Sequence, residues 1–74
     1  MEKFEIKEQN VSIVADKIEI GKGVEFGNNI DVKVHNYFGI GDYSRLGDNC
    51  HIRGRSVSFG DHFFNSSGLR IGGV

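Results

Sequence analysis

The side chains that could carry chemistry in this 74-residue chain are His35, His51, His62 and the single cysteine, Cys50. An imidazole titrates near neutral pH, so a well-placed histidine can take a proton from a hydroxyl or an amine during group transfer. A lone cysteine cannot form an internal disulfide, and we interpret Cys50 as a small core residue rather than a catalytic thiol. The role of each side chain depends on the elements that position it.

A repeat of six residues organises most of the chain. An aliphatic or aromatic residue followed by glycine recurs at Ile20, Phe26, Ile40, Leu46, Phe59 and Ile71. Val14 and Val32 extend the first series in steps of six, and Ile52 extends the second. The spacing slips by two residues between Val32 and Ile40 and by one between Ile52 and Phe59. Such a short period predicts a repeat architecture rather than an ordinary globular domain.

Each repeat has the pattern of a short strand and a corner. A second apolar residue precedes most of these positions by two, as in Ile18-Glu19-Ile20 and Ile30-Asp31-Val32, which is the alternation of a strand. Glycine with Asp or Asn then follows, which is typical of turns. The 11 glycines and the absence of proline also favour many tight turns between fully hydrogen-bonded strands. The pattern predicts an all-β fold with little or no helix. The alternative is a glycine-rich β-sandwich or meander, whose strands would be longer and more widely spaced than those of this repeat.

The stretch from Ile18 to Val74 resembles the hexapeptide-repeat acyltransferases. The resemblance rests on the pattern aliphatic-Gly-x-x-small-x, matched by Ile40-Gly41-Asp42-Tyr43-Ser44-Arg45 and by Leu46-Gly47-Asp48-Asn49-Cys50-His51. It implies a left-handed parallel β-helix of triangular section, with about three coils of three hexads each. It also implies transfer of an acetyl group from acetyl-CoA to a hydroxyl or amine of a small acceptor such as a sugar.

A histidine on or near an extended corner serves as the base in the enzymes of this family. The slip at Lys33-Val34-His35-Asn36-Tyr37 inserts residues at a corner, where a side chain can project from the helix. We therefore take His35 as the candidate catalytic base. His62 lies at another corner and is a second candidate. The alternative for both histidines is an ordinary position on the surface of a corner.

Stacked coils should bring equivalent residues of successive hexads together. The expected inward ladders are Ile20, Ile40 and Phe59; Phe26, Leu46 and Asn65; and Val32, Ile52 and Ile71. On the outside, Glu25 should lie over Arg45, and Asp31 over His51. A carboxylate beside an imidazole can orient a base, but a surface pair is the interpretation we favour here.

The two ends of the chain differ from the repeat. Residues 1–16 alternate apolar and charged side chains and are expected to form a strand segment that caps the β-helix of residues 17–74. The lower end stops part-way into a hexad with no capping helix, and an open coil presents unpaired backbone groups. We therefore expect a homo-oligomer, either a trimer with parallel axes, as the resemblance implies, or an end-to-end pair.

Charge and hydropathy exclude several classes of function. A formal net charge of −1 gives no basis for binding nucleic acid or an anionic membrane. The charged N-terminal segment lacks the apolar stretch that a signal peptide contains, and no apolar run is long enough to span a membrane. We therefore expect a cytoplasmic location. Three histidines could in principle serve a metal-dependent hydratase of the carbonic anhydrase type, but they occupy dissimilar hexad positions, so no metal is expected.

Two functions follow as hypotheses. The first is a short or truncated acetyltransferase of the hexapeptide superfamily, with His35 as base, acetyl-CoA as donor and a small-molecule acceptor. The alternative is a non-catalytic β-helical module for assembly or binding. The first predicts binding and turnover of acetyl-CoA, whereas the second requires only the fold and its open edge.

Overall fold

The computed structural model describes residues 1–72 and is almost entirely β-structure. Its only helical element among these residues is a three-residue 3-10 turn. The elements in chain order are β1 (Glu2–Ile6), η1 (Lys7–Gln9), β2 (Val11–Ala15), β3 (Lys17–Ile20), β4 (Glu25–Phe26), β5 (Ile30–Ile40), β6 (Arg45–Leu46), β7 (Cys50–Phe59) and β8 (Arg70–Ile71). Val74, where the predicted β-helix ends, lies outside the described residues.

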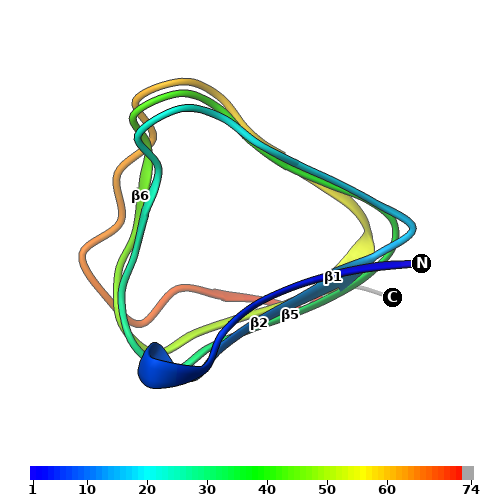
Figure 1. Ribbon diagram of the computed structural model, residues 1–74, viewed down its shortest axis with the longest axis horizontal. Coiled ribbons are helices and arrows are strands. Elements are labelled where there is room, and N and C mark those ends of the chain that lie inside the picture. The colour runs from blue at the N-terminus through cyan, green and yellow to red at the C-terminus, as the bar shows by residue number, and fades with distance from the viewer. Residues whose placement is uncertain (73–74) are drawn as a thin grey trace.

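The chain winds into a triangular solenoid of about three coils (Figure 1). Followed from the N-terminus in that view, the chain turns anticlockwise as it recedes, so the coils are left-handed. We call its three sides faces A, B and C. Face A stacks β2, residues 30–34, residues 50–54 and β8; face B stacks β3, residues 37–40 and residues 56–59. Face C pairs β4 with β6 and continues through a bridge from Arg45 to Phe64.

The strand register confirms two of the predicted ladders in full and the first pair of the third. Ile20 pairs with Ile40 and Ile40 with Phe59 on face B, while Val32, Ile52 and Ile71 are successive partners on face A. Phe26 pairs with Leu46 on face C, and the outward pairs Glu25–Arg45 and Asp31–His51 are also partners. Asn65 occupies an apolar position of the repeat, and its Oδ1 accepts a hydrogen bond from Cys50 Sγ at 3.5 Å.

One residue was assigned to the wrong side of its strand. Val14 was predicted to begin the inward series, but Ile13 is the partner of Val32 and is fully buried, whereas Val14 pairs with Lys33 on the outside. The reason is an extra residue at the corner between faces A and B in the first coil. Ile13 to Ile20 spans seven positions, Val32 to Ile40 eight, and Ile52 to Phe59 seven. The prolonged corner is therefore a feature of every coil.

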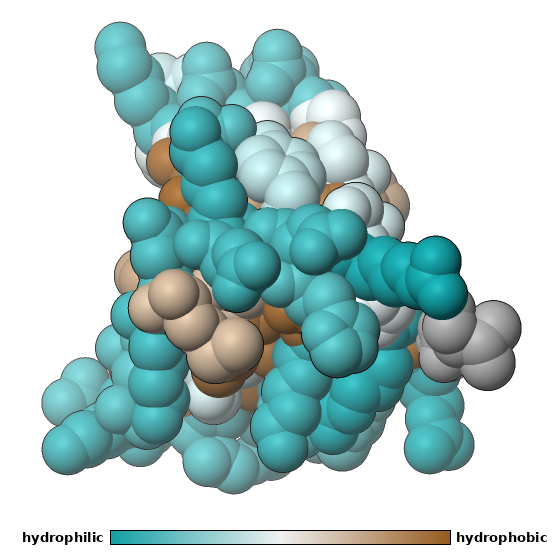
Figure 2. Space-filling model, turned by 90° about the vertical axis from the view of Figure 1, so that its right-hand side faces the viewer, coloured by the Kyte–Doolittle hydropathy of each residue, from teal (hydrophilic) through white to brown (hydrophobic). Residues whose placement is uncertain are grey.

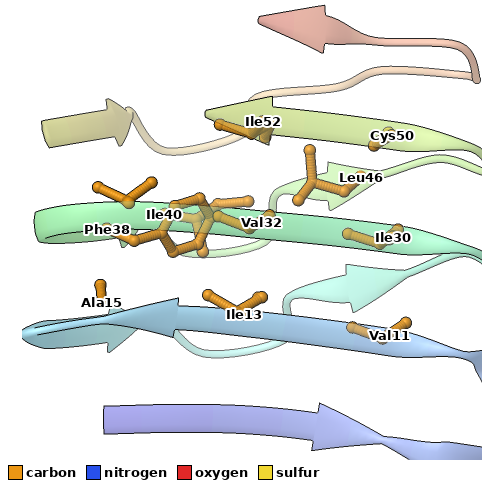
Figure 3. Close-up of a cluster of buried hydrophobic side chains, with 11 residues drawn as sticks. Val11, Ile13, Ala15, Ile30, Val32, Phe38, Ile40, Leu46, Cys50 and Ile52 are labelled. Atoms are coloured by element: carbon orange, nitrogen blue, oxygen red, sulfur yellow. The ribbon is translucent and has the colours of Figure 1, made fainter. Parts of the chain in front are cut away.

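The core is a single column of apolar side chains inside the triangle. Its residues come from all stacked coils and point toward the axis (Figure 3). The buried hydrophobic residues are Val11, Ile13, Ala15, Ile30, Val32, Val34, Phe38, Ile40, Leu46, Cys50 and Ile52. Phe38 is the largest fully buried side chain. Ser44 and Cys50 are buried, as predicted for the small residues of the repeat. The inward side chains of each alternating strand therefore fill the inside of the coil.

Aspartates bind the corners of successive coils together. Asp42 Oδ1 accepts a hydrogen bond from the amide of Lys22 at 2.9 Å, and Asp61 Oδ1 accepts one from the amide of Asp42 at 2.9 Å. At another corner, Asp48 Oδ1 accepts from the amide of Asn28 at 2.8 Å. These carboxylates satisfy turn N–H groups that have no strand partner, which explains why Asp follows glycine in the repeat.

The N-terminal segment covers the edge of the first coil. β1 runs antiparallel to β2, and the Phe4 ring packs on Phe26 with centroids 5.3 Å apart. Gln9 Nε2 donates hydrogen bonds to the carbonyls of Phe26 (2.6 Å) and Gly27 (3.1 Å), which are free edge groups of β4. β2 itself pairs in parallel with β5 as a rung of face A. Within residues 1–72, no helix has the length and hydrophobicity to cross a bilayer.

Candidate functional site

His35 projects outward from a bulge at the corner between faces A and B. The register pairs Val34 with Gly54 and then resumes with Tyr37 and Ser56, so His35 and Asn36 lie opposite the single residue Arg55. A bulge of this kind leaves residues outside the regular pairing and redirects their side chains. The side chain of His35 is exposed, and its carbonyl accepts a hydrogen bond from the amide of Asp16 at 3.2 Å. The predicted extended corner therefore exists and carries His35.

An open groove of about 590 Å³ runs along this corner. Three stacked strands and the N-terminal residue line it, and its lining residues are Met1, Val14, Lys33, Val34, His35, Arg53, Gly54 and Arg55. Figure 2 looks onto this corner and shows hydrophilic side chains over most of it, with more hydrophobic surface exposed between them. The groove thus combines an apolar floor with polar walls, which is the usual composition of a small-molecule site.

The walls of the groove carry cationic side chains in equivalent positions of two coils. Lys33-Val34-His35 of β5 lies beside Arg53-Gly54-Arg55 of β7, with Lys33 and Arg53 as register partners. Arg53 forms an ion pair with Asp31, with 2.9 Å between Arg53 Nη2 and Asp31 Oδ2. Lys33 and Arg55 are exposed and make no ion pair within the described part of the chain. This cluster was not predicted from the sequence, although Lys33 and Arg53 occupy equivalent positions of successive coils and their spacing would have revealed it.

The other candidate residues lie apart from His35. His51 is the register partner of Asp31, but the carboxylate of Asp31 is held by Arg53 rather than by the imidazole. His62 stacks on Tyr43 at a different corner, with ring centroids 5.9 Å apart and planes 15° apart. No cluster of three or more His, Cys, Asp or Glu side chains among residues 1–72 is arranged to hold a metal ion. The three histidines therefore do not converge on one site.

Cys50 belongs to the core. Its side chain is fully buried, and Sγ donates a hydrogen bond to the carbonyl of Gly47 at 3.1 Å. Burial raises the pKa of the Cys50 thiol, because a thiolate would lose its hydration there. On face B, the Tyr37 hydroxyl donates to Glu19 Oε1 at 2.8 Å, and this hydrogen bond raises the pKa of Tyr37. Neither group is prepared to act as a nucleophile near neutral pH.

No family model, no curated protein and no solved structure matches this chain in comparisons with known proteins. The groove at the corner between faces A and B, with His35 at its wall, is the arrangement in the described residues that best combines a base with a binding surface.

Proposed function

We propose that this chain is a short acetyltransferase-like β-helix that uses acetyl-CoA as donor and acetylates a hydroxyl or amine of a small acceptor in the cytoplasm. The observation that carries the proposal is the position of His35. It projects from the bulged corner and lines a groove of about 590 Å³, large enough for a small acceptor. The hexapeptide pattern supplies the reaction type, and the groove supplies the place where the acceptor would meet the base.

In this proposal, His35 acts as the general base. A ring nitrogen accepts the proton of the acceptor hydroxyl or amine while the acceptor atom bonds to the acetyl carbonyl carbon. The carbon–sulfur bond then breaks, and the proton passes to the departing thiolate, so that free coenzyme A thiol is released. Because the side chain of His35 is exposed, water can take up the proton from the ring after the transfer.

Replacing His35 with alanine should lower the turnover number by at least about 100-fold, because general-base catalysis contributes that much or more. Release of free thiol from acetyl-CoA with a panel of hydroxyl and amine acceptors measures the rate. His51→Ala is the matched control, since His51 is also exposed but lies outside the groove. Equal turnover in wild-type protein and His35→Ala would contradict the role of His35. No thiol release with any acceptor would contradict the acetyltransferase function.

A non-catalytic assembly module is the second candidate, and the C-terminal edge of the solenoid favours it. β1, Glu2 and Gln9 cover the opposite edge, where the Ile18 amide donates to Glu2 Oε1 at 2.7 Å. At the C-terminal edge, β8 pairs with only two residues of β7, and Phe64 is 66% exposed. Among residues 1–72, no strand pairs with the outer edge of β8, and a strand edge beside an exposed aromatic ring is a surface on which a second copy can pair end to end.

Sedimentation velocity tests the assembly candidate. We expect a homo-oligomer at low micromolar concentration, and Phe64→Asp should shift it toward monomer because a carboxylate would be desolvated in the interface. Lys22→Asp is the control, since it also introduces a carboxylate at an exposed position but leaves the C-terminal edge unchanged. A folded wild-type monomer at this concentration would contradict end-to-end assembly.

A further inference from the structure

We infer that the groove beside His35 selects an acceptor that carries an anionic group, a carboxylate or a phosphate. The inference rests on the proposed function and names the class of its acceptor. Lys33 and Arg55 would bind the anion, Arg53 would help to fix it, and the hydroxyl or amine of the acceptor would lie next to His35. None of the eight lining residues is acidic, although the chain as a whole has a formal net charge of −1.

The register brings like charges together at this site. Lys33 and Arg53 are direct partners on neighbouring parallel strands, whose spacing is roughly 4.8 Å. Arg55 lies two residues further along β7, opposite the bulge that carries His35, and lines the same groove. The carboxylate of Asp31 offsets the charge of Arg53, whereas Lys33 and Arg55 have no ion-pair partner among residues 1–72. A bound anion between Lys33 and Arg55 would supply the counter-charge that these two side chains lack.

The ion pair between Arg53 and Asp31 gives the groove a fixed wall. Besides the 2.9 Å contact with Asp31 Oδ2, one guanidinium nitrogen of Arg53 donates to the carbonyls of Ile52 (3.1 Å) and Asp31 (3.4 Å). These bonds hold the guanidinium of Arg53 against the strand, while Lys33 and Arg55 keep their side chains free. One positioned cation and two adaptable ones suit a small anion better than a long polyanion, which would need a continuous row of charges.

The floor of the groove places a further limit on the acceptor. Val14 contributes apolar surface beneath the charged walls, and Val34, a core residue only 4% exposed, adds little to it. Because Val14 faces outward at the prolonged corner, this surface is available to a ligand. An acceptor with a neutral carbon skeleton and one anionic group fits both parts of the groove. A cationic amine would be repelled by Lys33 and Arg55, so aminoglycoside-like acceptors are disfavoured.

The test compares four probes of similar size by isothermal titration calorimetry and by chemical shifts, in the absence of acetyl-CoA, which carries its own phosphates. We expect glucose 6-phosphate and glucuronate to bind, and glucose and glucosamine not to bind at the same concentrations. Lys33→Gln and Arg55→Gln should each weaken binding of glucose 6-phosphate about three- to five-fold, in line with exposed charge pairs. Lys22→Gln, an exposed lysine outside the groove, should leave binding unchanged.

The outcomes separate this inference from the proposed function. Glucose 6-phosphate binding that is weakened about three- to five-fold in Lys33→Gln but unchanged in Lys22→Gln supports the anion site, whether or not thiol is released. Equal binding of glucose and glucose 6-phosphate would overturn the inference even if acetyl transfer to a neutral sugar is observed. Equal losses in Lys22→Gln and Lys33→Gln would also overturn it, because the attraction would then be a property of the overall charge. Binding of the anionic probes without any thiol release would overturn only the acetyltransferase function.

Discussion

Replacing Phe38 with alanine is expected to remove a large part of the protein's free energy of unfolding. Phe38 is fully buried, and its ring meets the Phe59 ring edge to face with centroids 6.2 Å apart. Truncating a buried phenylalanine costs about 3–5 kcal/mol through lost transfer energy and the cavity that remains. A chain of 74 residues has a free energy of unfolding of roughly 4–11 kcal/mol by its size. The substitution therefore removes a large part of the total stability.

The physical reason for so large an effect is the narrow core. Phe38 lies between Ile18 and Val57 in the ladder of face B, so its ring contacts the coils above and below. The rungs are bound to one another by strand pairing, and the triangle cannot collapse into the space that a missing ring would leave. Sites that cannot relax show the upper end of the cost of truncation.

Urea unfolding followed by far-ultraviolet circular dichroism measures the change in unfolding free energy. Phe64→Ala is the matched control, because this phenylalanine is 66% exposed and its truncation should change the monomer's stability by less than about 0.5 kcal/mol. Similar losses at Phe38 and Phe64 would show that the ring of Phe38 is not enclosed by the core. The comparison is made at a concentration where wild-type protein sediments as a monomer.

The sequence was sufficient to predict the ladders because strand periodicity leaves little freedom. An in-out-in triplet can face the axis in one way only, and a shift by one residue would turn its apolar side chains to water. Ile20, Ile40 and Phe59 therefore had to stack, and they do. Corners carry no such constraint. The extra residue before Ile20 could lie anywhere between Ile13 and Lys17. For this reason Val14 was assigned to the inner side of its strand instead of the outer side.

The candidate site was predictable only in part, for a related reason. The slip at residues 33–37 located the prolonged corner and thus His35, since an insertion must project from a closed coil. The register of Asp31 with His51 was also predicted, but the ion partner of Asp31 was not. A long arginine side chain can reach diagonally to a neighbouring strand. Arg53 therefore binds the carboxylate of Asp31, although His51 is the direct register partner of Asp31. Register alone does not determine how flexible side chains pair.

Corner glycines are expected to differ sharply in their tolerance of alanine, depending on whether a coil lies beneath them. A Cβ at Gly47 would overlap the backbone carbonyl of Ser66 and would come within 2.7 Å of the carbonyl oxygen of Asn65. Backbone atoms cannot rotate away as a side chain can, so relief requires the two coils to move apart. We expect Gly47→Ala to cost about 3 kcal/mol, the upper end of the usual cost of overpacking.

Gly60→Ala is the matched control for Gly47→Ala, because Gly60 begins a corner of the same type but a Cβ there meets nothing within 4 Å. Its expected effect in the monomer is a gain of about 0.4–1 kcal/mol, since alanine restricts the unfolded chain. Thermal and urea unfolding of both variants at monomeric concentration measure the difference. Equal destabilisation by the two substitutions would contradict this explanation. The requirement for glycine at Gly47 thus comes from the neighbouring coil rather than from the corner itself.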